Sequence, residues 1–485
     1  MTEDPIDNSK KTQRNQLILF IVTLITTTMA GAEWMTNKML FYGEDRMTWS
    51  DFLGGLAYSV PLLLILSVHE FGHYFMAKYH KIKVTLPYYI PLWFGFIGIP
   101  SFGTMGAVIR IKEAILERKG YFDVGIAGPL AGFVIAFFVL IYGFTHLPDP
   151  EIIYDIHPEY EQFGADYADE VYSYEFRVFQ HHQYYKSYRQ QDSTQYLEKN
   201  NSMEGWHYDE FEPFPSYESH SMGTTLLFEW MKNWLVDDPR LIPNEFEIMH
   251  YPILFAGFLA LFFTALNLIP IGQLDGGHIL YGMAGPKWHK RLAQVLFIAF
   301  VYFAGLGMFH PSTIGQDLIN ELIYLGFLYF CFYRFSPDYK DRVMFALGIF
   351  AAQIVTVMIL PDVKGYMGWL LFSLVLGRFI GIYHPPVLID KPLDSRRKVL
   401  GWVALFVFII SFSPQPFNVH EIKKPQTNEE MSETPTFLSA MNPSPNWTRI
   451  DIPNSRALPS MKCINSREEI KVFDRIPSGS KNCDL

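Results

Sequence analysis

Long apolar runs alternate with polar segments along most of this chain of 485 residues. Nine runs are candidate membrane helices, although several are shorter than the roughly 20 residues that a full crossing needs. They occupy residues 16–35, 52–78, 120–145, 250–270, 291–309, 317–333, 342–360, 366–383 and 398–413. The pattern predicts an all-α polytopic membrane protein with about nine transmembrane helices.

A further apolar stretch, residues 86–100, does not have the composition of a continuous helix. It contains three prolines and two glycines, namely Pro87, Pro91, Pro100, Gly95 and Gly98. Non-helical backbone at membrane depth is tolerated where protein buries it. We therefore predict a re-entrant β-hairpin with strands near residues 84–89 and 104–111.

Two polar segments divide the chain further. Residues 147–249 form an acidic and aromatic insertion with few aliphatic runs before Met222, so we expect little packed core there. Residues 414–485 are rich in Pro, Ser and Asn, and we expect this tail to be largely disordered. The expected units are an N-terminal tail, first span and outer loop (1–50), the first half of an apolar core (51–146), the insertion (147–249), the second half of the core (250–310), additional helices (311–413) and the tail (414–485).

Two features of the insertion leave alternatives open. Residues 223–236 place Trp230 and Trp234 on helical spacing with aliphatic residues, so this helix could lie in the membrane interface or cover a small domain of its own. His181 and His182 could bind a metal, but a solvated polar loop is the commoner setting for such a pair.

Basic residues indicate the orientation of the spans, because cytoplasmic loops are enriched in Lys and Arg. With nine spans the main clusters fall on one side; they include Lys10, Lys11 and Arg14 before the first run and Arg396, Arg397 and Lys398 before the last. We predict a multi-pass protein of the cell inner membrane, with a cytoplasmic N-terminus, no cleavable signal peptide, and the insertion and C-terminal tail outside. Cys463 and Cys483 of the tail are then free thiols or a disulfide. The net charge of −10 argues against nucleic acid as a partner.

The second apolar run contains the sequence His69-Glu70-Phe71-Gly72-His73. Ionisable side chains at this depth are expensive and usually functional. On a helix, His69 and His73 share one face and can hold one Zn²⁺, while Glu70 stands beside the metal as a general base. A buried histidine pair with hydrogen-bonded partners is the alternative interpretation, but it leaves Glu70 unexplained.

A second motif, from Asn267 through Pro270 to Asp275, follows another apolar run. Zinc with two histidines needs a third protein ligand and an open position for water. Pro270 ends the helix and the two glycines after Asp275 allow a tight turn, so this carboxylate can point inward. On its own, Asp275 would be interpreted as a helix cap; beside the first motif, we interpret it as the third zinc ligand.

The paired motifs HExxH and NxxPxxxLDG resemble those of the site-2 protease family of intramembrane zinc metalloproteases, in a bacterial-type form. Residues 102–109 and 127–132 look like the re-entrant loop and the next core helix of that family. The resemblance covers about residues 50–145 and 249–282. It implies His69, His73 and Asp275 as zinc ligands, Glu70 as the catalytic base and Asn267 as a contact to the substrate backbone.

The resemblance also implies what the protein acts on. Expected substrates are single-span membrane proteins in the lipid bilayer, with anti-sigma factors and remnant signal peptides as candidates. Three alternatives remain: a membrane metalloprotease of another type, such as the prenyl-protein proteases, a metal-binding membrane transporter, and a protease-like scaffold that does not cleave. The ligand Asp275 and the nearly carboxylate-free later spans argue against the first two, and an intact Glu70 argues against the third.

Overall fold

The computed structural model describes residues 5–43, 45–200, 202, 211–316 and 318–424, and these residues are mostly helical, as predicted. The longer helices are α1 (Pro5–Thr36), α3 (Leu56–Tyr79), α4 (Arg118–Thr145), α7 (Tyr174–Asn200), α9 (Pro252–Leu268), α10 (Asp275–Ala304), α11 (Leu318–Cys331), α12 (Tyr339–Ile359) and α14 (Ser395–Ser411). Shorter helices include α2 (Trp49–Gly54), α5 (Ile152–Ile156), α6 (Tyr167–Val171), α8 (Leu226–Leu235) and α13 (Gly368–Leu374).

Every predicted span coincides with a helix. Within the described residues, four helical stretches are long and apolar enough to cross a membrane: Lys10–Thr36, Trp49–Tyr79, Arg118–Thr145 and Tyr339–Ile359. The apolar helices Pro252–Leu268, Leu318–Cys331 and Gly368–Ile380 are shorter; the last consists of α13 and the π-helical segment Val375–Ile380 that continues it. The structure thus supports a membrane protein with several spans, and the count of nine stays a prediction.

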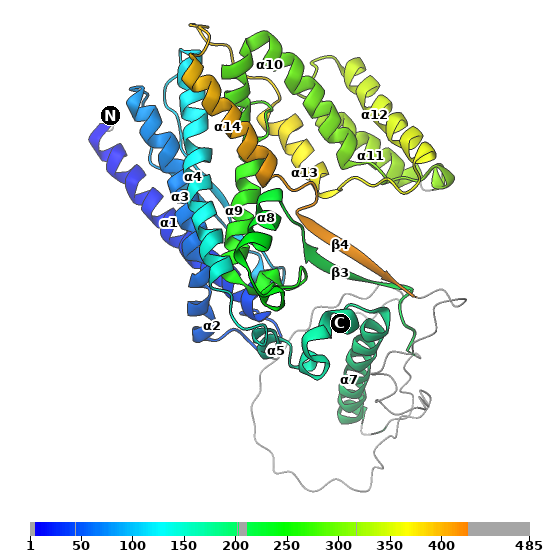
Figure 1. Cartoon of the computed structure of the whole chain (residues 1–485). Coiled ribbons are helices and arrows are strands. Elements are labelled where there is room, and N and C mark those ends of the chain that lie inside the picture. The colour runs from blue at the N-terminus through cyan, green and yellow to red at the C-terminus, as the bar shows by residue number, and fades with distance from the viewer. Residues whose placement is uncertain (1–4, 44, 201, 203–210, 317, 425–485) are drawn as a thin grey trace. The chain divides into compact units, whose positions relative to one another are not determined.

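Two helical groups form the interior. Helices α1, α3 and α4 run side by side in Figure 1, and α9 packs against α3 and α4. A second group, α10 to α13, surrounds buried side chains such as Phe297, Leu328 and Phe332. Helix α10 is broken at Gly285, which has a φ of +79° and is followed by Pro286. The first part of α10 packs with α4, and its later part packs with the second group.

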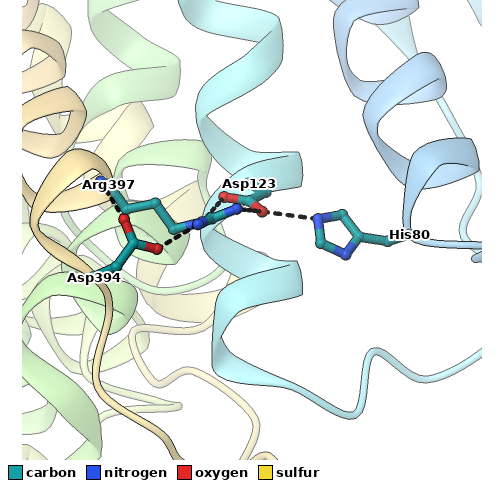
Figure 2. Close-up of polar contacts among 4 residues, drawn as sticks. All are labelled: His80, Asp123, Asp394 and Arg397. Carbon is teal, nitrogen blue, oxygen red and sulfur yellow. Dashed lines mark hydrogen bonds and ion pairs between the residues drawn. The ribbon is translucent and has the colours of Figure 1, made fainter.

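A network of polar side chains joins α3, α4 and α14 (Figure 2). The buried carboxylate of Asp123 on α4 accepts two hydrogen bonds from Arg397 on α14, at 2.7 and 2.8 Å. Its Oδ2 also lies 2.8 Å from Nε2 of His80, the residue that ends α3. Arg397 makes a further ion pair with Asp394, the N-cap residue of α14. The network therefore fixes the end of α3 that follows the HEFGH motif.

The predicted hairpin is present. Strand β1 (Tyr88–Leu92) pairs antiparallel with β2 (Gly103–Val108), with a register shift between Tyr89 and Pro91, and a bridge between Val84 and Ile111 extends it. Helix α1 supports the hairpin, because Thr26 donates a hydrogen bond to the carbonyl of Gly103 at 2.7 Å. The first strand begins later than expected, and the depth of the hairpin in a bilayer stays a prediction.

The insertion is more ordered than its composition indicated. Tyr160, Val171 and Phe176 are buried together with neighbouring aromatic rings, so a small aromatic core replaces the missing aliphatic one. His181 and His182 lie on α7 and not in a loop; Nδ1 of His181 is 3.0 Å from the hydroxyl of Tyr217.

Helix α8 confirms the helical spacing read from residues 223–236. Its buried face packs on the membrane core, with the ring of Phe228 4.9 Å from that of Phe144 on α4. Trp230 and Trp234 are exposed and stack on each other. The helix therefore covers the core and leaves its tryptophan face open, as an interfacial helix would.

The first part of the tail corrects the prediction of disorder from residue 414 onward. Strand β4 (Phe417–Lys423) pairs antiparallel with β3 (Ser216–Met222) of the insertion over the full length of both strands, from Ser216 opposite Lys423 to Met222 opposite Phe417. Figure 1 shows the two strands together. The rest of the predicted tail, including Cys463 and Cys483, lies outside the described residues.

Candidate metal centre

The two histidines of the HEFGH motif face each other on α3. His69 and His73 are buried, their ring centroids are 4.8 Å apart, and the distance between their Nε2 atoms is 3.0 Å. Their spacing of one helical turn explains this arrangement, because residues i and i+4 share a face of a helix. The pair faces α4 and α10.

Asp275 joins this pair from the start of α10. After α9 ends at Leu268, a short irregular segment turns the chain so that Asp275 is the first helical residue. Its Oδ2 lies 3.4 Å from Nε2 of His69 and 3.2 Å from Nε2 of His73. Gly276 is required next, since a β-carbon there would stand 2.0 Å from the carbonyl oxygen of Leu268.

The three donor atoms form a triangle whose sides are 3.0, 3.2 and 3.4 Å. Tetrahedral zinc, with bonds of about 2.0–2.2 Å to nitrogen and oxygen, separates its ligand atoms by roughly 3.3–3.5 Å. The triangle is therefore close to the size that zinc requires. Two imidazoles and one carboxylate are also a donor set typical of a catalytic zinc site, which leaves a fourth position for water.

The second ring nitrogen of His73 is held by the protein. Nδ1 of His73 lies 2.7 Å from the carbonyl oxygen of Val124 on α4, and since a carbonyl only accepts, Nδ1 carries the proton. The lone pair of Nε2 is then free to face a metal. Gly128, one turn further along α4, leaves the space for this ring.

Glu70 is buried beside the triangle, with Oε1 4.0 Å from Nε2 of His69. The hydroxyl groups of Ser67 on α3 and Tyr89 on β1 lie 2.7 Å apart. The hairpin is thus attached to the same face of α3 that carries the site.

Asn267 lies in the last turn of α9 and is half-buried. It stands at the beginning of the break that leads to Asp275, on the segment between α9 and α10. The structure therefore brings His69, His73 and Asp275 into one triangle with Glu70 beside it. The role of Asn267 toward a substrate stays a prediction, as do the roles of the other four residues.

Sequence reasoning missed the side chains that hold α10 in place. Buried Arg118 at the start of α4 donates from Nε to the carbonyl of Gly282 at 2.9 Å. Nδ1 of His278 lies 2.8 Å from Nε2 of His384, which comes from the segment after α13. These contacts join segments far apart in the chain, and no local pattern indicates them.

Comparison with known proteins agrees with the geometry. Residues 57–309, more than half of the chain, match peptidase family M50, and this range contains both motifs. The chain therefore belongs to peptidase family M50, which confirms the resemblance to the site-2 protease family.

Relatives named as zinc metalloproteases match parts of the chain. The probable zinc metalloprotease EGY2, chloroplastic, of Oryza sativa subsp. indica is 22% identical over 275 residues, which cover 57% of this chain and 37% of that protein. Its counterpart in Arabidopsis thaliana is 32% identical over 147 residues, or 30% of this chain and 25% of that protein. The probable zinc metalloprotease EGY1, chloroplastic, of Oryza sativa subsp. japonica is 27% identical over 236 residues, or 47% and 28%.

The matches to these relatives thus span 37% or less of the relatives' own length. No solved structure matches the chain.

Proposed function

We propose that the protein is a zinc-dependent intramembrane endopeptidase that cleaves the transmembrane segments of single-span membrane proteins. The observation that carries this proposal is the buried triangle of His69, His73 and Asp275 with Glu70 beside it. Two of its ligands lie on a helix that is long and apolar enough to cross a membrane. Family membership and the names of the relatives support zinc as the metal.

The residues have distinct tasks in this proposal. His69, His73 and Asp275 hold the metal, and the carbonyl of Val124 fixes the ring orientation of His73. When bound, zinc supplies an acidified water and a Lewis acid for the scissile carbonyl. Glu70 accepts the proton of the attacking water and passes it to the leaving amine.

The hairpin is the proposed support for the substrate. A helical substrate hides its peptide bonds in its own hydrogen bonds, so it must unwind before cleavage, and its freed backbone groups need partners in lipid. Among the described residues, the β1–β2 sheet has two strands, so each has one edge without a neighbouring strand. A substrate segment could pair along such an edge beside Glu70, with Asn267 as a further backbone contact.

Orientation and substrate class stay proposals: the first rests on the distribution of charges in the sequence, and the second on the family resemblance. The distribution of Lys and Arg favours a cytoplasmic N-terminus and an extracytoplasmic insertion in an inner membrane. The site would then lie toward the cytoplasmic ends of its helices. Anti-sigma factors and remnant signal peptides are substrates of suitable architecture, because each presents a single span once its outer part has been trimmed.

The test is cleavage by the purified protein in liposomes. A panel of single-span proteins, each with and without its outer domain, is incubated with the zinc-loaded wild type and with Glu70→Gln as the control. We expect cuts within the transmembrane segments by the wild type and none by the variant, with equal zinc in both. Zinc-loaded wild type that binds panel members without cutting any of them would support a scaffold, and metal-dependent ion flux without cleavage would support a transporter.

A further inference from the structure

A second group of metal-binding side chains lies in the insertion, outside the HEFGH helix. His157 ends α5, while Glu247 and His250 belong to the turn directly before α9. Each contributes one donor atom, and these atoms lie within 4.8 Å of one another. The group was not indicated by sequence, since its members are separated by most of the insertion.

One distance in this group, between His250 and Glu247, resembles those of the candidate metal centre. Nε2 of His250 lies 3.3 Å from Oε2 of Glu247. This distance exceeds the 2.7–2.9 Å that is typical of a charge-assisted hydrogen bond. It equals the separation of roughly 3.3 Å expected for two ligands of one tetrahedral zinc ion. The imidazole of His157 completes the group, with its ring centroid 5.4 Å from that of His250.

The polar atoms of His250 and Glu247 that point away from the group make hydrogen bonds within the protein. Nδ1 of His250 lies 3.2 Å from the carbonyl oxygen of Met35 at the end of α1, so this nitrogen carries the proton and Nε2 offers its lone pair. The hydroxyl of Tyr172 donates a hydrogen bond to Oε1 of Glu247, which leaves Oε2 toward the group. Such outer partners orient the ligands of protein metal sites, as Val124 does for His73.

The three side chains are largely buried, and the cavity that they line has space for an ion. Glu247 and His250 are 2% and 6% exposed, and His157 is half-buried. All three line a cavity of about 330 Å³, which is large enough for an ion with bound water. Burying the charge of a carboxylate is costly, and a bound cation would offset this cost for Glu247.

Arg177 also lines this cavity; its two Nη atoms are directed to other groups, while its buried Nε has no hydrogen-bond partner among the described residues. Nη2 donates to Ser219 at 2.9 Å, Nη1 donates to Gln180 at 3.1 Å, and the group lies over the ring of Tyr172. The donor set available to an ion is therefore two imidazoles and one carboxylate. Imidazole-rich sets favour zinc and similar transition metals over Ca²⁺ and Mg²⁺.

We propose that His157, Glu247 and His250 form a second metal site, which binds Zn²⁺ or a similar divalent transition-metal ion. The ion joins the beginning of the insertion to its end, and through the Met35 carbonyl it also fixes the end of α1. Closing this long loop stabilises the folded insertion. Because Tyr251 follows directly and α9 starts at Pro252, the site also fixes the entry of the helix that carries Asn267.

The test separates the two sites by emptying the first. The full chain with His69→Ala and His73→Ala is purified, equilibrated with Zn²⁺ and freed of loose metal by gel filtration, and its zinc is measured. We expect about one zinc per chain, lost when His250→Ala or Glu247→Gln is added and retained when the exposed His146 at the end of α4 is changed to Ala instead. With Co²⁺ in place of Zn²⁺, the visible absorption bands of a tetrahedral site should follow the same pattern.

Thermal unfolding distinguishes metal binding by these side chains from a purely structural role. Added Zn²⁺ should raise the Tm of the His69→Ala/His73→Ala protein, and Glu247→Gln should remove that rise while the circular dichroism spectrum stays that of a folded protein. No zinc in the doubly substituted protein, or zinc that persists after both His250→Ala and Glu247→Gln, overturns the proposal. A Tm that falls in Glu247→Gln equally with and without Zn²⁺ also overturns it, since an ion pair between Glu247 and His250 would behave in that way.

Discussion

Gly128 on α4 lies so close to the imidazole of His73 that a β-carbon at this position would stand 2.2 Å from Nε2. The neighbouring atom is the proposed metal donor itself, and the ring cannot move away because its other nitrogen is hydrogen-bonded to the carbonyl of Val124. The glycine is therefore part of the geometry of the metal centre, although it has no side chain to offer.

The first prediction concerns this glycine. Gly128→Ala should displace the His73 ring and reduce zinc affinity by at least about tenfold, with cleavage lost in parallel. Metal content after dialysis against a weak chelator measures the effect. The control is Gly348→Ala on α12, where a β-carbon meets no atom within 4 Å. Equal zinc retention by the two variants would contradict the assignment of His73 as a ligand.

The second prediction distinguishes the ligands from the base. Asp275→Ala removes one side of the donor triangle, so the variant should lose most of its zinc from this centre, as should His73→Ala. Glu70→Gln should keep the zinc and lose cleavage, because Glu70 acts on the water and does not complete the triangle. Zinc analysis together with turnover of one substrate checks both halves. Loss of zinc in Glu70→Gln would make Glu70 a ligand.

The third prediction concerns the network of Figure 2. Asp123→Ala leaves Arg397 and His80 without their shared carboxylate, and breaking a buried pair in this way costs on the order of 3 kcal/mol. Asp394→Ala, which removes a more exposed partner of the same arginine and a helix cap, should cost clearly less. Thermal unfolding in detergent compares them. A larger loss for Asp394→Ala would mean that the cap, and not the α4–α14 link, supports this end of α3.

The fourth prediction concerns the strand that follows α14. A chain that ends after Ser413 loses β4, the packing of Phe417 on Phe102, and the hydrogen bond from Trp369 to the carbonyl of Pro414. We expect a clearly lower Tm and faster proteolysis of the insertion. A chain that ends after Lys424 keeps every contact described above and is the matched control. Indistinguishable unfolding of the two truncated chains would show that β4 contributes nothing to stability.

Local patterns in the sequence predicted the features that depend on interactions between neighbouring residues. The apolar runs gave the helices, and the i, i+4 spacing placed His69 and His73 on one face. The break at Pro270 with Gly276 correctly indicated that Asp275 turns toward them. The helices and the shared face of His69 and His73 are set by interactions within a few residues, so they are visible in a single sequence. The approach of Asp275 to this pair is a long-range contact, and it could be expected only because the two motifs were considered together.

Contacts between distant segments could not be predicted in this way. The pairing of β4 with β3 joins the end of the described chain to the insertion, and a short polar strand has no signal that names its partner. The same holds for Arg118 with Gly282 and for His157 with Glu247 and His250. The aromatic core of the insertion was missed for a different reason: Tyr and Phe there replace the aliphatic residues by which cores are usually recognised.

The position of Asp275 in the chain has a consequence for how the protein is made. Helix α3 leaves the ribosome with His69, Glu70 and His73 long before the segment that completes their triangle has been synthesised. During that interval the nascent chain carries His69, Glu70 and His73 in a long apolar helix without the carboxylate of Asp275. Assembly of the centre is therefore a late step of membrane insertion. A chain that stops before residue 275 lacks this carboxylate, so it cannot become an active peptidase while other membrane proteins nearby are still unfolded.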